Sequence, residues 1–211
     1  KGLAKSAVAY KVDETQYDLS DQLKDNAQVS IITIQSEEGL EIMRHTLTAQ
    51  VLARAIKNLY PKSKLAIGPT IEDGFYYDVE SEEVISSDDL IKIEAEMKNI
   101  IKTKSLLTKK LVSKSEALKI FKEKKEPFKE IIINESNQKN DFQLYYQDNE
   151  EFVDLCRGPH LPNLGFIGSF KLTKVSGAYW KGDSKNTMLT RIYGTAFNSD
   201  KDLQKHLNEV E

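Results

Sequence analysis

One short segment, VDLCRGPHLPN at residues 153–163, holds the residue types best suited to chemistry. It contains the single cysteine of the chain, Cys156, and one of its three histidines, His160. A Gly-Pro dipeptide between them disfavours a helix, so we expect the pair on a turn at a strand end, where functional groups are often displayed. A thiol beside Arg157 and an imidazole would tend toward the thiolate, which suits a base or a ligand. A buried free cysteine near a hydrogen-bonded histidine is the structural alternative.

The second histidine, His45, is predicted on a long amphipathic helix. Apolar residues recur at three- and four-residue steps through SEEGLEIMRHTLTAQVLARAIKNLYP, and Pro61 ends the pattern. At about 100° per residue, His45 falls on the apolar side of this helix with Leu52 and Ile56. It is therefore either a core histidine with a hydrogen-bond partner or a group presented to a site. The third histidine, His206, lies in a polar terminal helix and is expected at the surface.

The elements that must position these groups indicate an α+β fold, in which a mostly antiparallel sheet packs against helices. Residues 1–36 form a small β-rich piece, and 64–80 predict two strands around a Gly-Pro turn. Two further helices are expected at 86–102 and 113–127, the second closed by its proline. Strand patterns dominate after Lys129, at 130–134, 142–147, 151–156, 166–180 and 187–197.

Composition excludes several classes of protein. With 39% hydrophobic and 30% charged residues, the chain can form a globular core. No apolar run approaches the roughly 18 residues of a membrane span, and the start, KGLAKSAVAY, lacks a signal-peptide pattern. One cysteine excludes an internal disulfide and fits a reducing compartment, so we expect a cytoplasmic protein. Phosphate-loop, dinucleotide-binding and serine-hydrolase motifs are absent.

The net charge of −3 conceals two runs of opposite sign. Residues 72–97 carry ten acids and one lysine, and residues 98–125 carry ten lysines and two glutamates. Two solvated helix faces are the plain interpretation. The alternative is a basic strip, Lys98–Lys125, that follows a phosphate backbone.

Three segments resemble the N-terminal part of bacterial-type threonyl-tRNA synthetases: KLAIGPTIEDGFYYDV, DLCRGPHLPN and GFIGSFKLTKVSGAYWKGDSKNTMLTRIYGTAF. The likeness extends over essentially the whole chain. It implies a partial β-grasp (TGS-like) domain at 1–36 and an editing domain at 37–198, of the second additional domain type shared with alanyl-tRNA synthetases. Residues 199–211 would begin the linker helix to a catalytic core that is absent here.

The resemblance implies an activity, the hydrolysis of seryl-tRNA(Thr). Serine lacks only the methyl group of threonine, and one missing methyl group discriminates by only about 10–200-fold in a binding pocket. A second site must therefore remove the error by water attack on the aminoacyl ester. The alternative is a degenerate domain that binds tRNA or supports the synthetase without editing.

The family signature is HxxxH on a helix and CxxxH on a loop, and this chain keeps only the second half, Cys156 and His160. Four residues after His45 stands Ala49. Counting back from IKNLYP instead places Thr46 and Gln50 at the histidine positions of the family. A one-residue bulge in the helix would reconcile the first register.

Roles follow from the same resemblance. His45 is expected to act as the base or to hold the water, with Lys129 orienting the water or stabilising the oxyanion. Cys156 and His160 would shape the pocket. The remaining family-like positions are Asp154 for the α-ammonium group of the substrate and Tyr77 for the terminal adenosine.

We expect no cofactor. Zinc bound by Cys156 and His160, together with His45, is the alternative, because related alanyl editors bind zinc there. Zinc sites of this type usually have four protein ligands, or three and a water, and three candidates at most are present. The expected partner is the acceptor end of tRNA(Thr), and no membrane is involved. The full-length enzyme is expected to be a homodimer through its core, and this fragment a monomer.

Overall fold

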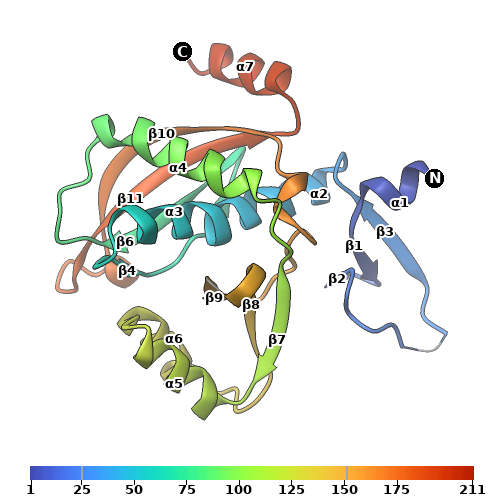
Figure 1. Cartoon of the computed structure of the whole chain (residues 1–211), viewed down its shortest axis with the longest axis horizontal. Helices are drawn as coiled ribbons and strands as arrows, with labels where there is room; N and C mark the ends of the chain where they lie inside the picture. Colours follow the sequence, from blue (N-terminus) through green and yellow to red (C-terminus); the bar gives the residue numbers. More distant parts are fainter. Residues whose placement is uncertain (25, 151) are drawn as a thin grey trace.

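The computed structural model describes residues 1–24, 26–150 and 152–211 (Figure 1). Its α-helices are α1 (Gly2–Ser6), α2 (Glu37–Thr46), α3 (Ala53–Leu59), α4 (Leu90–Lys102), α5 (Lys114–Glu123), α6 (Pro127–Glu135) and α7 (Asp200–Glu209). A π-helical segment, Leu47–Leu52, joins α2 to α3. No helix in the described part of the chain has the length and apolarity needed to cross a membrane.

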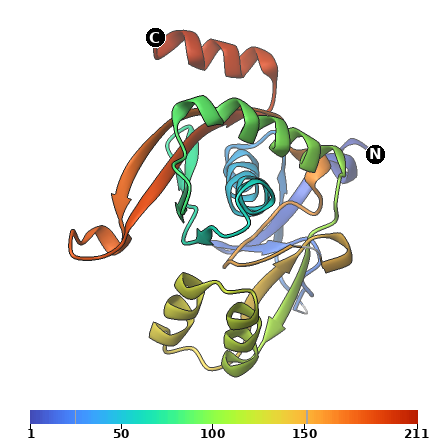
Figure 2. The ribbon, with the colours of Figure 1, turned by 60° about the vertical axis from the view of Figure 1, so that its left-hand side comes forward.

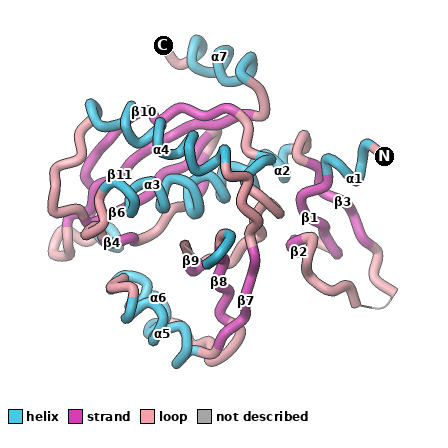
Figure 3. Tube along the Cα trace, viewed as in Figure 1, coloured by secondary structure: helices cyan, strands magenta, loops and turns pink. Residues whose placement is uncertain are grey.

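The strands form three separate antiparallel sheets (Figure 3). The N-terminal sheet has the order β2-β1-β3, from β1 (Ala7–Val12), β2 (Thr15–Asp18) and β3 (Val29–Thr33). The large sheet has the order β10-β11-β6-β4, with β5 also paired to β6; these are β4 (Lys64–Leu65), β5 (Thr70–Ile71), β6 (Gly74–Glu80), β10 (Ser169–Tyr179) and β11 (Met188–Phe197). The small sheet contains β7 (Thr108–Val112), β8 (Phe142–Tyr146) and β9 (Val153–Leu155). The predicted α+β class is confirmed.

The long helix formed by α2, the π-helical segment and α3 runs through the main core. In Figure 2 it lies between α4 and the strands of the large sheet. Its apolar side packs with side chains from the sheet and from α4, and the fully buried members include Met43, Leu47, Leu52, Ile56, Phe75, Val79, Ile93, Met97 and Ile192. Each such burial contributes about 1.5–3 kcal/mol, which holds this helix firmly enough to carry a site.

Polar contacts fix the ends and the register of α2. The Ser36 hydroxyl accepts a hydrogen bond from the Gly39 N–H at its start, at 3.0 Å, which satisfies one of the free amides of a helix N-terminus. Near its end, Arg44 is buried and its Nε donates to the Ala196 carbonyl at 2.9 Å. His45 directly follows Arg44, so the hydrogen bond from Arg44 to β11 also fixes the position of His45 along the helix axis.

One predicted strand is wrong. Residues 130–134 were expected to be a strand because of three consecutive isoleucines, but they belong to α6. Pro127 does not close the preceding helix either; it opens α6 near its N-terminus, where the missing N–H is not needed. Phe128, Lys129 and Ile133 are buried and Ile131 is exposed, which is a helical pattern of burial.

Candidate functional site

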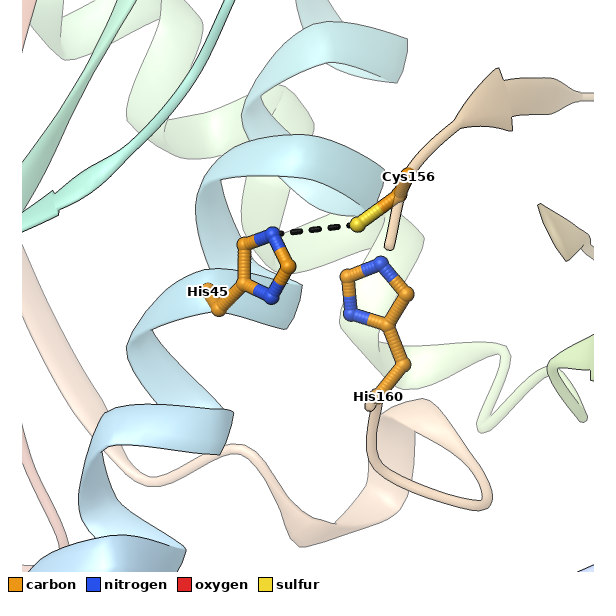
Figure 4. A group of neighbouring side chains, drawn as sticks. All are labelled: His45, Cys156 and His160. Atoms are coloured by element: carbon orange, nitrogen blue, oxygen red, sulfur yellow. Dashed lines mark hydrogen bonds between the residues drawn. The ribbon is translucent and has the colours of Figure 1, made fainter. Parts of the chain in front are cut away.

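The structure brings His45, Cys156 and His160 together (Figure 4). His45 comes from the end of α2, and the other two from the loop after β9. His45 Nε2 lies 3.1 Å from Cys156 Sγ, and the imidazole rings of His45 and His160 stack with their centroids 4.5 Å apart. The structure thus brings His45 against the loop of Cys156 and His160, although His45 lies 111 residues before Cys156 in the chain.

The π-helical segment explains the unusual spacing after His45. A π-helical turn is wider than an α-helical turn and holds one residue more. Ala49 lines the same cavity as His45. Gln50 faces elsewhere: its side-chain and backbone oxygens accept hydrogen bonds from Gln147 at 3.1 and 2.9 Å. The structure therefore places His45 and Ala49, four residues apart, on the wall of one cavity.

The hydrogen bonds of Thr46 define the protonation of His160. Thr46 Oγ1 donates to the Ile42 carbonyl at 2.9 Å, which uses its single proton. It accepts from the Leu161 N–H at 3.0 Å. In the third contact, with His160 Nδ1 at 2.9 Å, the imidazole must therefore donate the proton and Thr46 Oγ1 must accept it. His160 is therefore the Nδ1–H tautomer, and its Nε2 presents a lone pair that is buried without a partner among the described residues.

Burial sets the charge of all three groups. It lowers the pKa of His45, an effect that a hydrogen bond with the backbone of Pro159 partly offsets. It also lowers the pKa of His160 well below the usual range, with a further contribution from His45. Burial raises the pKa of Cys156 to about 12, although the Gly158 N–H donates to its sulfur at 3.2 Å. The expectation of a thiolate is thus wrong, because desolvation outweighs the polar neighbours.

Lys129, Asp154 and Tyr77 form a buried polar network behind the three groups. Lys129 Nζ lies 2.9 Å from Asp154 Oδ1, with both side chains at most 4% exposed. The same ammonium donates to the Ala66 carbonyl at 2.7 Å and to the Tyr77 hydroxyl at 3.1 Å. An ammonium has three protons, so all three are used.

This network changes what its members can do. Tyr77 is completely buried, so it supports the Lys129–Asp154 pair and has no surface to offer an adenosine. Burial raises the pKa of Tyr77 well above the usual range, and Asp154 adds to the effect. Gly68 is needed beside it, because a Cβ there would lie 2.2 Å from the Tyr77 ring. Lys129 would have to release a partner to reach a substrate.

A cavity of about 830 Å³ opens in front of these groups. Its lining includes His45, Cys156, Lys129 and Asp154, together with Ala49, Ile67, Gly68, Arg157 and residues from α6 and β8. Ligand cavities commonly fall in the range of about 300–1,000 Å³. The lining is mixed, with polar side chains such as Glu135 and Gln138 beside apolar ones such as Ile67 and Phe142, which suits a small polar molecule or the end of a larger one.

The three neighbouring groups also have the types of atom that bind transition metals. One ligand atom from each of His45, Cys156 and His160 lies within 4.8 Å of the others, and the bare Nε2 of His160 is a fitting ligand. Asp154, the nearest carboxylate of the network, is engaged by Lys129. Among the described residues the donor set is thus three at most, and its thiol is neutral, so binding would have to remove the proton from Cys156.

The basic strip, Lys98–Lys125, extends over α4, β7 and α5, which follow one another in Figure 1. Two of its lysines have carboxylate partners. Lys109 lies 3.2 Å from Asp18 and 2.6 Å from Asp21, and Lys110 pairs with Glu150. The exposed members are Lys98, Lys102, Lys104, Lys110, Lys119, Lys122, Lys124 and Lys125.

The lowered pKa of His45 has a measurable consequence for stability. The unfolded chain binds this proton near pH 6.5 and the folded chain only at lower pH, so the free energy of unfolding should decrease as the pH falls below about 6.5. Replacing His45 by glutamine removes this contribution, and urea unfolding between about pH 7.5 and 5 should show a weaker decrease for the variant. The same decrease in both proteins would contradict a lowered pKa at His45.

Comparisons with known proteins agree with this geometry. Residues 143–193, which include Asp154, Cys156 and His160, match the family described as "Threonyl and Alanyl tRNA synthetase second additional domain". The whole chain is 47% identical to a threonine–tRNA ligase of Prochlorococcus marinus (strain MIT 9515), covering 32% of that protein. Threonine–tRNA ligase 2 of Bacillus subtilis (strain 168) is 50% identical over 99% of the chain, again with 32% of the relative covered. The chain thus spans about a third of the length of these relatives.

Proposed function

We propose that this chain is the editing region of a threonyl-tRNA synthetase and hydrolyses seryl-tRNA(Thr). One observation carries the proposal: His45 reaches the Cys156–His160 loop at the wall of an open cavity, in a chain similar to threonine–tRNA ligases. We assign residues 1–36 to a partial TGS-like domain, 37–198 to the editing domain and 199–211 to a linker helix. The partner is the acceptor end of tRNA(Thr) in the cytoplasm, and the complete enzyme is a homodimer.

The reaction needs a base that is neutral near pH 7. Burial lowers the pKa of His45, so its ring can accept a proton from water when a water replaces the Cys156 contact at Nε2. The water oxygen attacks the ester carbonyl and the bond to the ribose oxygen breaks. That oxygen takes the proton back from His45 as serine leaves. Cys156 and His160 form the adjacent wall.

We propose that Asp154 holds the α-ammonium group of the substrate, since the residue lines the cavity. Its side chain is 3% exposed, so the ammonium group must enter the cavity wall to reach the carboxylate. Lys129 is then a positioning residue: its bond to Asp154 Oδ1 orients the carboxylate. We propose that the reaction runs without a metal ion, because the base and the water are sufficient and the described residues offer three ligand groups at most.

The proposal is tested by single-turnover hydrolysis of seryl-tRNA(Thr), with and without a chelator. Cys156→Ala is the informative variant, because it opens the wall beside His45 without touching the Lys129–Asp154 pair. We expect hydrolysis above the rate in buffer, resistance to the chelator, and a slower reaction with Cys156→Ala. A wild-type rate equal to that in buffer would reject the editing function.

We further propose that the basic strip binds the tRNA backbone. Changing Lys98, Lys102, Lys119 and Lys122 to alanine should reduce the slope of log affinity against log salt, by roughly 0.7–0.9 for each phosphate that the variant no longer neutralises. A fluorescence titration of tRNA over a range of salt concentrations measures this slope. The control changes exposed lysines outside the strip, at positions 5, 24, 201 and 205. An unchanged slope in the strip variant would reject this role.

A second function, binding of tRNA without editing, is favoured by Ala49. This residue lies on the cavity wall beside His45 where a second imidazole would complete the family signature. If the missing imidazole limits the site, Ala49→His should raise the single-turnover rate by about 10²-fold, the lower end of the usual contribution of a general base. Ala49→Gln controls for side-chain size. A histidine variant no faster than wild type would show that Ala49 is not the limiting position.

A further inference from the structure

The N-terminal sheet inserts one carboxylate behind the loop that carries Cys156 and His160. Asp18, at the end of β2, is 6% exposed. Its Oδ1 accepts from the backbone N–H of His160 at 2.9 Å. Its Oδ2 accepts from the Tyr145 hydroxyl at 2.7 Å and lies 3.2 Å from Lys109 Nζ. One side chain therefore ties β2, β7, β8 and the loop together.

Tyr145 contacts both Asp18 and the imidazole of His160. Its ring meets the His160 ring edge-on, with centroids 4.5 Å apart at 86°. Burial raises the pKa of Tyr145 far above the usual range, with Asp18 as the next cause, so the phenol keeps its proton and donates it. The loop is fitted closely to this hydroxyl: Gly158 has φ +63, and a Cβ there would lie 2.0 Å from the Tyr145 oxygen.

A second acid keeps Asp18 in place. Asp21 Oδ2 accepts from the backbone N–H of Asp18 at 3.0 Å, and Asp21 Oδ1 lies 2.6 Å from Lys109 Nζ. Burial opposes the charge of Lys109, but its bonds to Asp21 and Asp18 outweigh this and raise its pKa. Charged hydrogen bonds of this kind are among the stronger ones in proteins, so the whole group is rigid.

We propose that Asp18 is a positioning residue for the site, through which the N-terminal sheet holds His160 in register with His45. The effect on hydrolysis rests on the function proposed above, but the effect on the loop does not. The site is then complete only when the N-terminal sheet is docked, although none of its residues supplies a reacting group.

The test compares Asp18→Ala, Asp18→Asn and Glu14→Gln, the last an exposed residue of the same hairpin. Amide hydrogen exchange of His160 and the nitrogen NMR signals of its imidazole report the loop directly. With Asp18→Ala we expect the backbone amide of His160 to exchange about tenfold faster, because one charged hydrogen bond is lost. We also expect a mixture of imidazole tautomers at His160. Asp18→Asn should recover part of the protection, since its amide oxygen still accepts from the His160 N–H while its NH₂ group faces Lys109 and Tyr145. Glu14→Gln should match wild type.

The same variants separate this proposal from the editing function. On seryl-tRNA(Thr), Asp18→Ala should lower kcat about tenfold and KM much less, because the loop is misplaced and the tRNA contacts are not. If wild type does not hydrolyse the ester, the editing function fails and the two NMR measurements still decide the role of Asp18. If Asp18→Ala does not fold, Tyr145→Phe removes only the hydroxyl bond. Wild-type exchange and imidazole signals in the folded variants would overturn the proposal.

Discussion

Replacing His45 with alanine should lower the single-turnover rate of seryl-tRNA(Thr) hydrolysis by about 10²–10⁴-fold, the usual contribution of a general base. His45 is the imidazole that lines the cavity, and burial keeps it neutral near pH 7 by lowering its pKa. Ala49 has no titratable group, and the neighbouring imidazole of His160 does not line the cavity, so neither is placed to take over as the base. The loss should therefore appear in the rate of the chemical step and not in the affinity for tRNA.

The matched control is His206→Ala. This residue lies on α7 against Phe197, with ring centroids 5.0 Å apart, and it does not line the cavity. The His206 variant should hydrolyse the ester at the wild-type rate. Equal losses in the two variants would remove His45 from the reaction and would leave its contact with Cys156 as a packing interaction.

Replacing Lys129 with methionine should destabilise the fold by about 3–5 kcal/mol, because it leaves Asp154 buried without its cation. The pair is 2.9 Å apart with side chains 4% and 3% exposed, so water cannot replace the missing partner. Asp154→Asn should be destabilising for the converse reason. Urea unfolding followed by far-UV circular dichroism measures both effects.

An exposed ion pair on the same helix provides the control. Lys181 reaches Glu135 of α6 at 2.6 Å, with side chains 47% and 56% exposed, and Lys181→Met should cost about 0–1 kcal/mol. The double variant of Lys129→Met and Asp154→Asn should be less destabilised than the sum of the single variants, since it leaves no unpaired charge. Equal effects of Lys129→Met and Lys181→Met would contradict the buried network.

Local sequence signals placed the two halves of the site separately, and only the family resemblance joined them. The Gly-Pro turn marked the loop of Cys156 and His160, and the apolar spacing placed His45 on the inner side of a helix. The charge of Cys156 could not be predicted, since Arg157 is near in sequence while burial is a property of the fold. The same limit applied to Tyr77, whose family-like position does not reveal that it is fully buried.

Long-range contacts account for the site residues that sequence patterns do not reveal. Nothing near Asp18 in the sequence distinguishes it from the other acids of its turn, and its partner His160 is 142 residues away. The spacing presents Thr46 only as a replacement for a histidine, yet its hydroxyl fixes the tautomer of His160. The wrong strand prediction at residues 130–134 has a local cause, because three isoleucines favour a strand by propensity. The segment is helical instead, because its neighbouring residues are buried in a helical pattern.

The most direct test of the central claim is to compare seryl-tRNA(Thr) with threonyl-tRNA(Thr) in single-turnover hydrolysis by the unmodified chain. An editing site must remove serine and spare threonine, and one methyl group allows roughly 10–200-fold discrimination. We predict that the seryl ester is hydrolysed well above its rate in buffer and at least about tenfold faster than the threonyl ester. A seryl ester that decays at the buffer rate, or no faster than the threonyl ester, would contradict the account.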